Sequence, residues 1–132
     1  MATFTLDGRS FDDIPGFYRQ INALFMTGAA DWALGDSLDA LDDMLYGGYG
    51  RLAEQPDGPH TLIWTDSAKS ETDLGRAATE GWLRAKIARP DVYAPGPAAR
   101  QLAALLDGSG QTYFQILVEL FNQHPNITLS LR

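Results

Sequence analysis

One stretch limits what this chain can fold into, because it contains residues that must be buried and, between them, charged residues that must be exposed. Residues 36–46 read Asp-Ser-Leu-Asp-Ala-Leu-Asp-Asp-Met-Leu-Tyr. At about 100° per residue, leucines fall on one face of a helix and aspartates on the opposite face. The apolar face carries Leu38, Leu41 and Leu45, and the acidic face carries Asp36, Asp39 and Asp43. We therefore predict an amphipathic helix that packs on a core and presents carboxylates to solvent.

The ends of this helix are marked by residues that commonly cap helices. Either Asp36 or Ser37 can cap the N-terminus, because each side chain can accept a hydrogen bond from a free N–H group of the first turn. Gly47 is the residue type that commonly ends a helix. We expect the helix to lie between these positions.

The acidic face is locally unfavourable. No lysine or arginine occurs among residues 31–50, and two carboxylates four residues apart, such as Asp39 and Asp43, repel by roughly 0.2–0.5 kcal/mol. The helix dipole also disfavours Asp42 and Asp43 near the C-terminal end. Two interpretations remain open: a solvated face that a stable domain tolerates, or a carboxylate surface that a cationic partner requires.

The run from Leu34 to Leu45 resembles the signature of the barstar family of intracellular ribonuclease inhibitors, roughly aromatic-Gly-x-Asn-Leu-Asp-Ala-Leu-x-Asp-x-Leu. The matching positions are Gly35, Leu38, Asp39, Ala40, Leu41, Asp43 and Leu45. In that family this helix and the loop before it plug a ribonuclease active site, where carboxylates meet basic residues that normally hold substrate phosphate. The resemblance implies the following partner contacts: Trp32, Leu34, Asp36, Asp39, Asp42, Asp43, Tyr46 and Gly47.

The chain departs from the family at several aromatic positions. Ala33 and Leu34 replace its tyrosines before the glycine, Asp42 replaces a tryptophan, and Gly48 replaces an aromatic residue after the helix. Aromatic residues often dominate interface energy, so their loss points to a different partner nuclease. Nearby aromatic residues can compensate by shifts of one or two positions: Trp32, Tyr46 and Tyr49. Trp32 is alternatively a hydrophobic staple for the helix.

Strands and helices alternate along the chain, which predicts an α/β fold with a small three-stranded parallel sheet packed with helices. We expect strands at residues 3–6, 60–65 and 126–131. The apolar run at 60–65 is typical of a strand covered on both faces. A first helix, which Asp12 or Asp13 can cap, presents a core-facing stripe of apolar residues: Ile14, Phe17, Ile21 and Leu24.

A helical insertion at about residues 66–110 is absent from compact family members. Its main part, about 76–108, contains two expected helices at 79–88 and 98–106. The loop 89–97 contains three prolines and is expected to be ordered but not helical. A segment this short is near the lower limit for independent folding, so we predict a single domain over 1–132. If the insertion packs away from the acidic helix, it should be dispensable for binding.

The last expected helix, residues 111–123, follows the family's spacing. Glu119 falls on the position of a glutamate that contacts the ribonuclease in that family. The alternative interpretation is that Glu119 is an ordinary exposed carboxylate of a helix.

Composition excludes several function classes. The net charge of −7 opposes direct nucleic-acid binding and favours basic partners. The absence of cysteine excludes disulfides and thiol chemistry. No apolar run is long enough to span a membrane and no secretion signal begins the chain, so we expect a cytoplasmic protein without membrane contact.

Catalytic motifs are also missing. We find no glycine-rich phosphate loop, nucleophile elbow or zinc spacing, and we expect His60 and His124 to have core or surface roles. We therefore expect no enzyme activity, no cofactor and no metal site.

Together with the resemblance, these features predict an inhibitor of a basic ribonuclease or nuclease toxin, in the manner of a bacterial immunity protein or antitoxin. Its carboxylates would mimic substrate phosphates, and the free protein would be a monomer. Two alternatives stay open: an acidic regulatory domain that binds a basic non-nuclease partner, and a small enzyme that uses the carboxylates.

Overall fold

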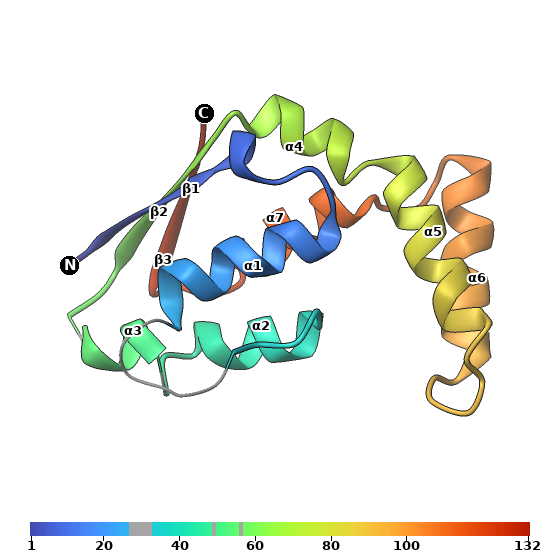
Figure 1. Ribbon diagram of the computed structural model, residues 1–132, viewed down its shortest axis with the longest axis horizontal. Coiled ribbons are helices and arrows are strands. Elements are labelled where there is room, and N and C mark those ends of the chain that lie inside the picture. Colours follow the sequence, from blue (N-terminus) through green and yellow to red (C-terminus); the bar gives the residue numbers. More distant parts are fainter. Residues whose placement is uncertain (27–32, 49, 56) are drawn as a thin grey trace.

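The computed structural model describes residues 1–26, 33–48, 50–55 and 57–132 (Figure 1). Three strands form one sheet in the order β1-β2-β3, and both pairings are parallel. The strands are β1 (Thr3–Asp7), β2 (His60–Thr65) and β3 (Ile127–Leu131). In register, Phe4 of β1 pairs with Leu62, which pairs with Leu129 of β3. The predicted α/β fold with a three-stranded parallel sheet is confirmed.

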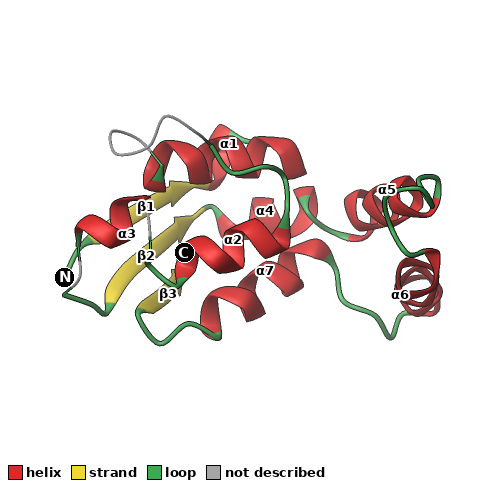
Figure 2. Ribbon diagram, turned by 90° about the horizontal axis from the view of Figure 1, so that it is seen from below, coloured by secondary structure: helices red, strands yellow, loops and turns green. Residues whose placement is uncertain are grey.

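Helices connect the strands, and some of them cover one side of the sheet. They are α1 (Ile14–Phe25), α2 (Leu38–Leu45), α3 (Gly50–Glu54), α4 (Ser67–Asp73), α5 (Arg76–Ile87), α6 (Pro95–Asp107) and α7 (Tyr113–Asn122), and a 3-10 turn η1 spans Gly8–Ser10. Both views show α1, α2 and α7 together beside the sheet (Figures 1 and 2). The α5–α6 hairpin lies at the opposite end of the molecule from the strands.

The core forms where α1 and α7 meet the sheet around Trp64 of β2. The indole ring stacks on Phe17 of α1 with ring centroids 5.6 Å apart, and it meets Phe114 of α7 edge-on at 5.2 Å. Its Nε1–H donates to the Ser70 hydroxyl at 3.0 Å, so the only polar atom of the indole is satisfied. The apolar stripe predicted for α1 is largely buried, since Phe17 and Ile21 are fully enclosed. Asp13, rather than Asp12, caps α1 by accepting from the Gly16 N–H at 2.7 Å.

The prediction that β2 is covered on both faces is wrong. His60, Leu62 and Trp64 are buried, whereas the alternate residues of the strand are only partly buried. On β1 the residues beside this second face, Thr3 and Thr5, are exposed. The helices that pack on the sheet lie on one side, so the other face carries threonines and Ile63, β-branched residues that suit strands.

The insertion is more helical than predicted. Helix α4 adds a helical segment before the two that were predicted, and α5 begins three residues earlier than predicted, at Arg76. Helix α6 begins at Pro95, so Pro95 and Pro97 lie in its first turn instead of the loop. Proline fits there because the first N–H groups of a helix have no intrahelical partner.

The base of the hairpin is joined to the core of the protein. The Thr79 hydroxyl accepts from the Tyr113 N–H and donates to the Gly75 carbonyl, each at 2.7 Å. Trp82 of α5 packs edge-on against the Tyr113 ring at 4.8 Å. Within the hairpin, α5 and α6 share a small apolar cluster of Leu83, Ala98 and Leu105. These contacts fix the direction in which α5 leaves the rest of the structure.

Candidate functional site

The acidic helix forms as predicted, and Ser37 is its N-cap. The Ser37 hydroxyl accepts from the Ala40 N–H at 3.3 Å. At the other end, the Gly47 N–H donates to the Met44 carbonyl at 3.0 Å. Gly47 has φ of +87°, a backbone conformation that favours glycine. Both boundaries of α2 therefore follow from local capping chemistry.

The two faces of α2 are separated as the sequence indicates. Leu41, Met44 and Leu45 are fully buried, and Leu38 is half-buried beside them. Asp36, at the turn before the helix, is exposed, as are Asp39 and Asp43. Among the ion pairs of the described residues, none joins a lysine or arginine to these three aspartates. The carboxylates thus face solvent without an internal cation.

Helix α7 brings Glu119 beside α2. Asp39, Asp42 and Glu119 line one shallow depression between the two helices. The Gln111 side-chain amide donates to the Glu119 carboxylate at 2.6 Å, which holds that side chain over the depression. Residues distant in sequence therefore place three carboxylates around one concave surface.

A histidine that sequence reasoning assigned no functional role supports this surface. His124 is only 4% exposed, and its Nε2–H donates to the Asp42 carboxylate at 2.7 Å. The exposed ring of Tyr46 lies edge-on to the His124 imidazole, with ring centroids 4.7 Å apart. Asn126 adds a hydrogen bond from its amide to the Leu45 carbonyl at 3.0 Å, which satisfies one of the free carbonyls at the end of α2. No local pattern reveals these contacts, since His124 lies 82 residues from Asp42.

Not every predicted contact residue reaches the surface. The Leu34 side chain is 6% exposed and belongs to the core, so the prediction that it contacts a partner is wrong. Its N–H donates to the Asn22 side chain at 2.7 Å, and its carbonyl accepts from the same amide at 3.2 Å. Leu34 therefore ties the segment before α2 to α1. Trp32 and Tyr49 lie outside the described residues.

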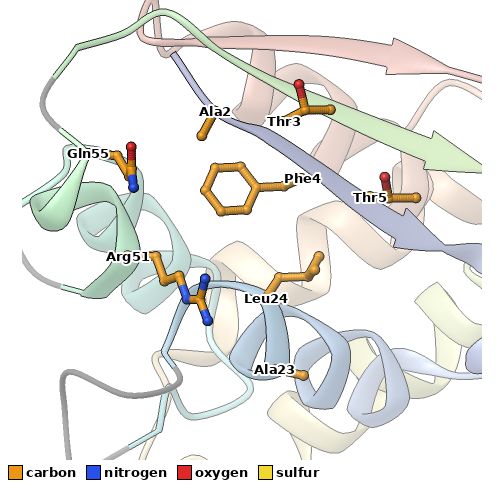
Figure 3. Close-up of a pocket in the computed structure, with 8 residues that line it drawn as sticks. All are labelled: Ala2, Thr3, Phe4, Thr5, Ala23, Leu24, Arg51 and Gln55. Carbon is orange, nitrogen blue, oxygen red and sulfur yellow. The ribbon is translucent and has the colours of Figure 1, made fainter.

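The other histidine and a separate hollow show no catalytic arrangement. His60 Nδ1 accepts from the Ala2 N–H at 2.9 Å, and Nε2–H donates to the Gln55 carbonyl at 2.6 Å, so both ring nitrogens have structural partners. The hollow between β1, α1 and α3 is lined by Phe4, Leu24 and Arg51 but by no carboxylate (Figure 3). Within the described ranges, no three metal-capable side chains converge on one point.

Two buried tyrosines, Tyr18 and Tyr113, lie near Asp36 at the N-terminal end of α2. The Tyr18 and Tyr113 hydroxyls form a hydrogen bond with each other. Burial raises the pKa of Tyr113 to about 12, and the nearby Asp36 carboxylate contributes to that increase. Burial also raises the pKa of Tyr18, with further contributions from Tyr113 and Asp36. These hydroxyls stay neutral at physiological pH and serve as a buried support.

The comparisons with known proteins point to one family. The family model described as barstar (barnase inhibitor) matches residues 1–85, which include the sheet strands β1 and β2, the acidic helix and most of α5. No curated protein and no solved structure matched the chain. Within the described residues, no helix has the length and apolar character needed to cross a membrane.

Proposed function

Since the chain belongs to the barstar family, we propose that it inhibits a basic ribonuclease or nuclease toxin by covering the active site of that enzyme with its acidic surface. We define the acidic surface as Asp36, Asp39, Asp42, Asp43 and Glu119. The observation that carries the proposal is the convergence of Asp39, Asp42 and Glu119 on one depression between α2 and α7.

The proposed mechanism is mimicry of substrate phosphates. A ribonuclease active site holds phosphate with lysines, arginines or histidines, and fixed carboxylates can meet the same groups. Because Asp36, Asp39 and Asp43 have no ion pair with a lysine or arginine of the described chain, they lose no internal cation when the enzyme binds. The partner's cations would instead relieve the repulsion along α2. Complementary charge would also speed association.

Residues around the acidic surface have supporting roles in this proposal. Tyr46 is 73% exposed beside Asp42 and offers an aromatic contact of the kind that often contributes most binding energy. Gly47 has no side chain at the end of α2, where an enzyme could approach the backbone closely. His124 orients the Asp42 carboxylate through the hydrogen bond described above.

The test is an inhibition assay with barnase and a panel of related basic ribonucleases. Asp39→Ala and Glu119→Ala should each weaken inhibition by roughly 2–5 kcal/mol, or about thirty- to several thousand-fold, because each leaves a buried cation of the enzyme without a partner. Glu71→Ala is the control, since Glu71 is an exposed carboxylate on α4, outside the acidic surface. Unchanged inhibition by both surface variants would remove the site assignment.

Two other outcomes would identify different functions. Tight binding of a basic protein without loss of its activity would support a regulatory domain. Turnover of RNA by the isolated chain would support an enzyme.

A further inference from the structure

The α5–α6 hairpin places basic and aromatic side chains beside the acidic surface. A groove of about 420 Å³ runs between the N-terminal end of α2 and helix α5 with its following loop. One wall carries Asp36 and Asp39, and the other carries Trp82, Lys86, Arg89 and Tyr93. The insertion therefore does not pack away from the acidic helix, which was the condition for it to be dispensable.

The basic wall of this groove is held in place by aromatic rings. Lys86 Nζ lies 4.4 Å from the centroid of the Trp82 ring and 5.4 Å from that of the Tyr93 ring. Trp82 is itself packed on Tyr113 of α7. No ion pair joins Lys86 to a carboxylate of the described residues. The ammonium group is thus positioned by the fold and remains available to an anionic group.

The charge of the chain is divided between the hairpin and the rest of the protein. Residues 76–108 contain five basic and three acidic residues, a net charge of +2, whereas the remaining residues carry −9. The loop at the end of the hairpin also exposes apolar surface, since Val92 is 54% and Tyr93 is 42% exposed. A basic and partly apolar element therefore stands next to an acidic one.

We propose that the α5–α6 hairpin is a second contact element of the inhibitor, and that the groove receives an aspartate or glutamate side chain of the ribonuclease from beside its basic active site. This inference rests on the proposed function. An enzyme face that was basic throughout would be attracted by α2 but repelled by Lys86 and Arg89. An enzyme face with a carboxylate next to its basic site pairs its cations with Asp36 and Asp39 and its carboxylate with Lys86 and Arg89. That carboxylate would meet Lys86 where aromatic rings reduce access to water.

The hairpin would then contribute to the choice of partner. Ribonucleases with a basic active site but no neighbouring carboxylate would leave Lys86 and Arg89 facing like charge, which costs binding energy. The acidic surface would recognise the class of enzyme, and the hairpin would discriminate among its members.

The test reverses single charges of the groove and asks whether binding to the ribonuclease becomes weaker or tighter. Lys86→Glu, Lys86→Gln and Arg89→Glu are compared with Arg100→Glu, the same charge change on an exposed position of α6 that does not line the groove. The probe is barnase and a panel of related basic ribonucleases, and the dissociation constant is measured at low salt. We expect Lys86→Glu and Arg89→Glu to weaken binding about ten-fold or more, with Lys86→Gln between them and the unmodified protein. Arg100→Glu should leave binding unchanged or slightly tighter.

General charge attraction predicts the opposite sign, because a more acidic inhibitor binds a uniformly basic enzyme more tightly. Unchanged or tighter binding by Lys86→Glu and Arg89→Glu would therefore overturn the inference. Thermal melts check that the variants fold. Arg89 is exposed and its ion pair with Asp91, at 3.7 Å, is exposed as well, so its substitution should have little effect on packing.

Parallel titrations of Asp39→Ala and Glu119→Ala separate the two proposals. If these variants bind more weakly while the Lys86 and Arg89 variants bind normally, only the role of the hairpin fails. If Asp39→Ala and Glu119→Ala bind normally, or no ribonuclease of the panel binds, the proposed function fails and this inference fails with it.

Discussion

Two adjacent aspartates of α2 should respond differently to alanine substitution. Asp43 is exposed and has no ion pair in the part of the chain that the structure describes. Replacement by alanine improves helix propensity by about 0.6 kcal/mol. It also removes repulsion from Asp39 and an unfavourable dipole interaction, together about 0.5 kcal/mol. We expect Asp43→Ala to raise the free energy of unfolding by about 1 kcal/mol.

Asp42→Ala gains the same helix propensity and dipole terms but loses a buried contact. His124 is 4% exposed and donates to the Asp42 carboxylate at 2.7 Å. A buried donor left without a partner costs about 1–3 kcal/mol. If the lost hydrogen bond costs only about 1 kcal/mol, the gain in helix propensity and dipole energy nearly cancels it; if it costs about 3 kcal/mol, the loss dominates. Asp42→Ala should therefore lie between unchanged and about 2 kcal/mol less stable. Because the helix terms are largely shared, the difference between the two variants measures the His124 contact.

The assay is urea and thermal unfolding of both variants at neutral pH. For a chain of this size a difference of 1 kcal/mol shifts the melting temperature by about 4 °C. Asp42→Asn is the control, since its amide oxygen can still accept from His124 Nε2–H, and it should lose less stability than Asp42→Ala. Equal stability of Asp42→Ala and Asp43→Ala would show that the His124 contact contributes nothing. Destabilisation by Asp43→Ala would refute the energetic account of the acidic face.

Three further predictions concern salt, pH and the hairpin. Raising ionic strength from about 0.05 to 0.5 M shortens the screening length roughly threefold. In stopped-flow mixing with a ribonuclease that the protein inhibits, the association rate should therefore fall far more than the dissociation rate rises. A salt-independent association rate would contradict charge pairing. Burial raises the pKa of both Tyr18 and Tyr113, so the stability gained by keeping these hydroxyls neutral is complete below about pH 10. The contribution of Tyr113, whose pKa is raised to about 12, is lost as pH rises through that value, and urea unfolding and tyrosinate absorbance should follow this loss together. Ionisation of all five tyrosines near pH 10 in the folded protein would refute this. Replacement of residues 76–108 by a Gly/Ser linker should weaken ribonuclease binding and lower the melting temperature, because it removes the groove and uncovers Tyr113; unchanged affinity would show that the hairpin makes no contact.

The parts of the fold that could be predicted from sequence depend on local physics. Capping by Asp13 and Ser37 uses side chains that lie three residues from their partners. The separation of leucines and aspartates on α2 follows from helical periodicity alone. The apolar stripe of α1 is predictable for the same reason.

The parts that could not be predicted depend on which elements meet in three dimensions. The coverage of β2 depends on helices that all pack on one side of the sheet, although residues 60–65 read as an apolar run typical of a strand covered on both faces. Leu34 looked like a loop residue free to contact a partner, but its backbone pairs with the Asn22 side chain and draws it into the core. The hairpin's position depends on Trp82 packing against Tyr113, a pair with no signature in either local sequence.

The way in which α2 is held explains how an unfavourable acidic face can persist. Salt bridges would stabilise it, but they would also occupy the carboxylates that the proposed function requires. The structure instead secures α2 through buried leucines, the Asn126 amide on the Leu45 carbonyl, and His124 on Asp42. Hydrogen bonds of this kind fix the helix without adding a lysine or arginine to its surface. The repulsion along α2 is therefore retained in the free protein, and its relief adds to the affinity for whatever cations arrive. On this reasoning Asp43→Ala should produce a more stable protein that is a weaker inhibitor.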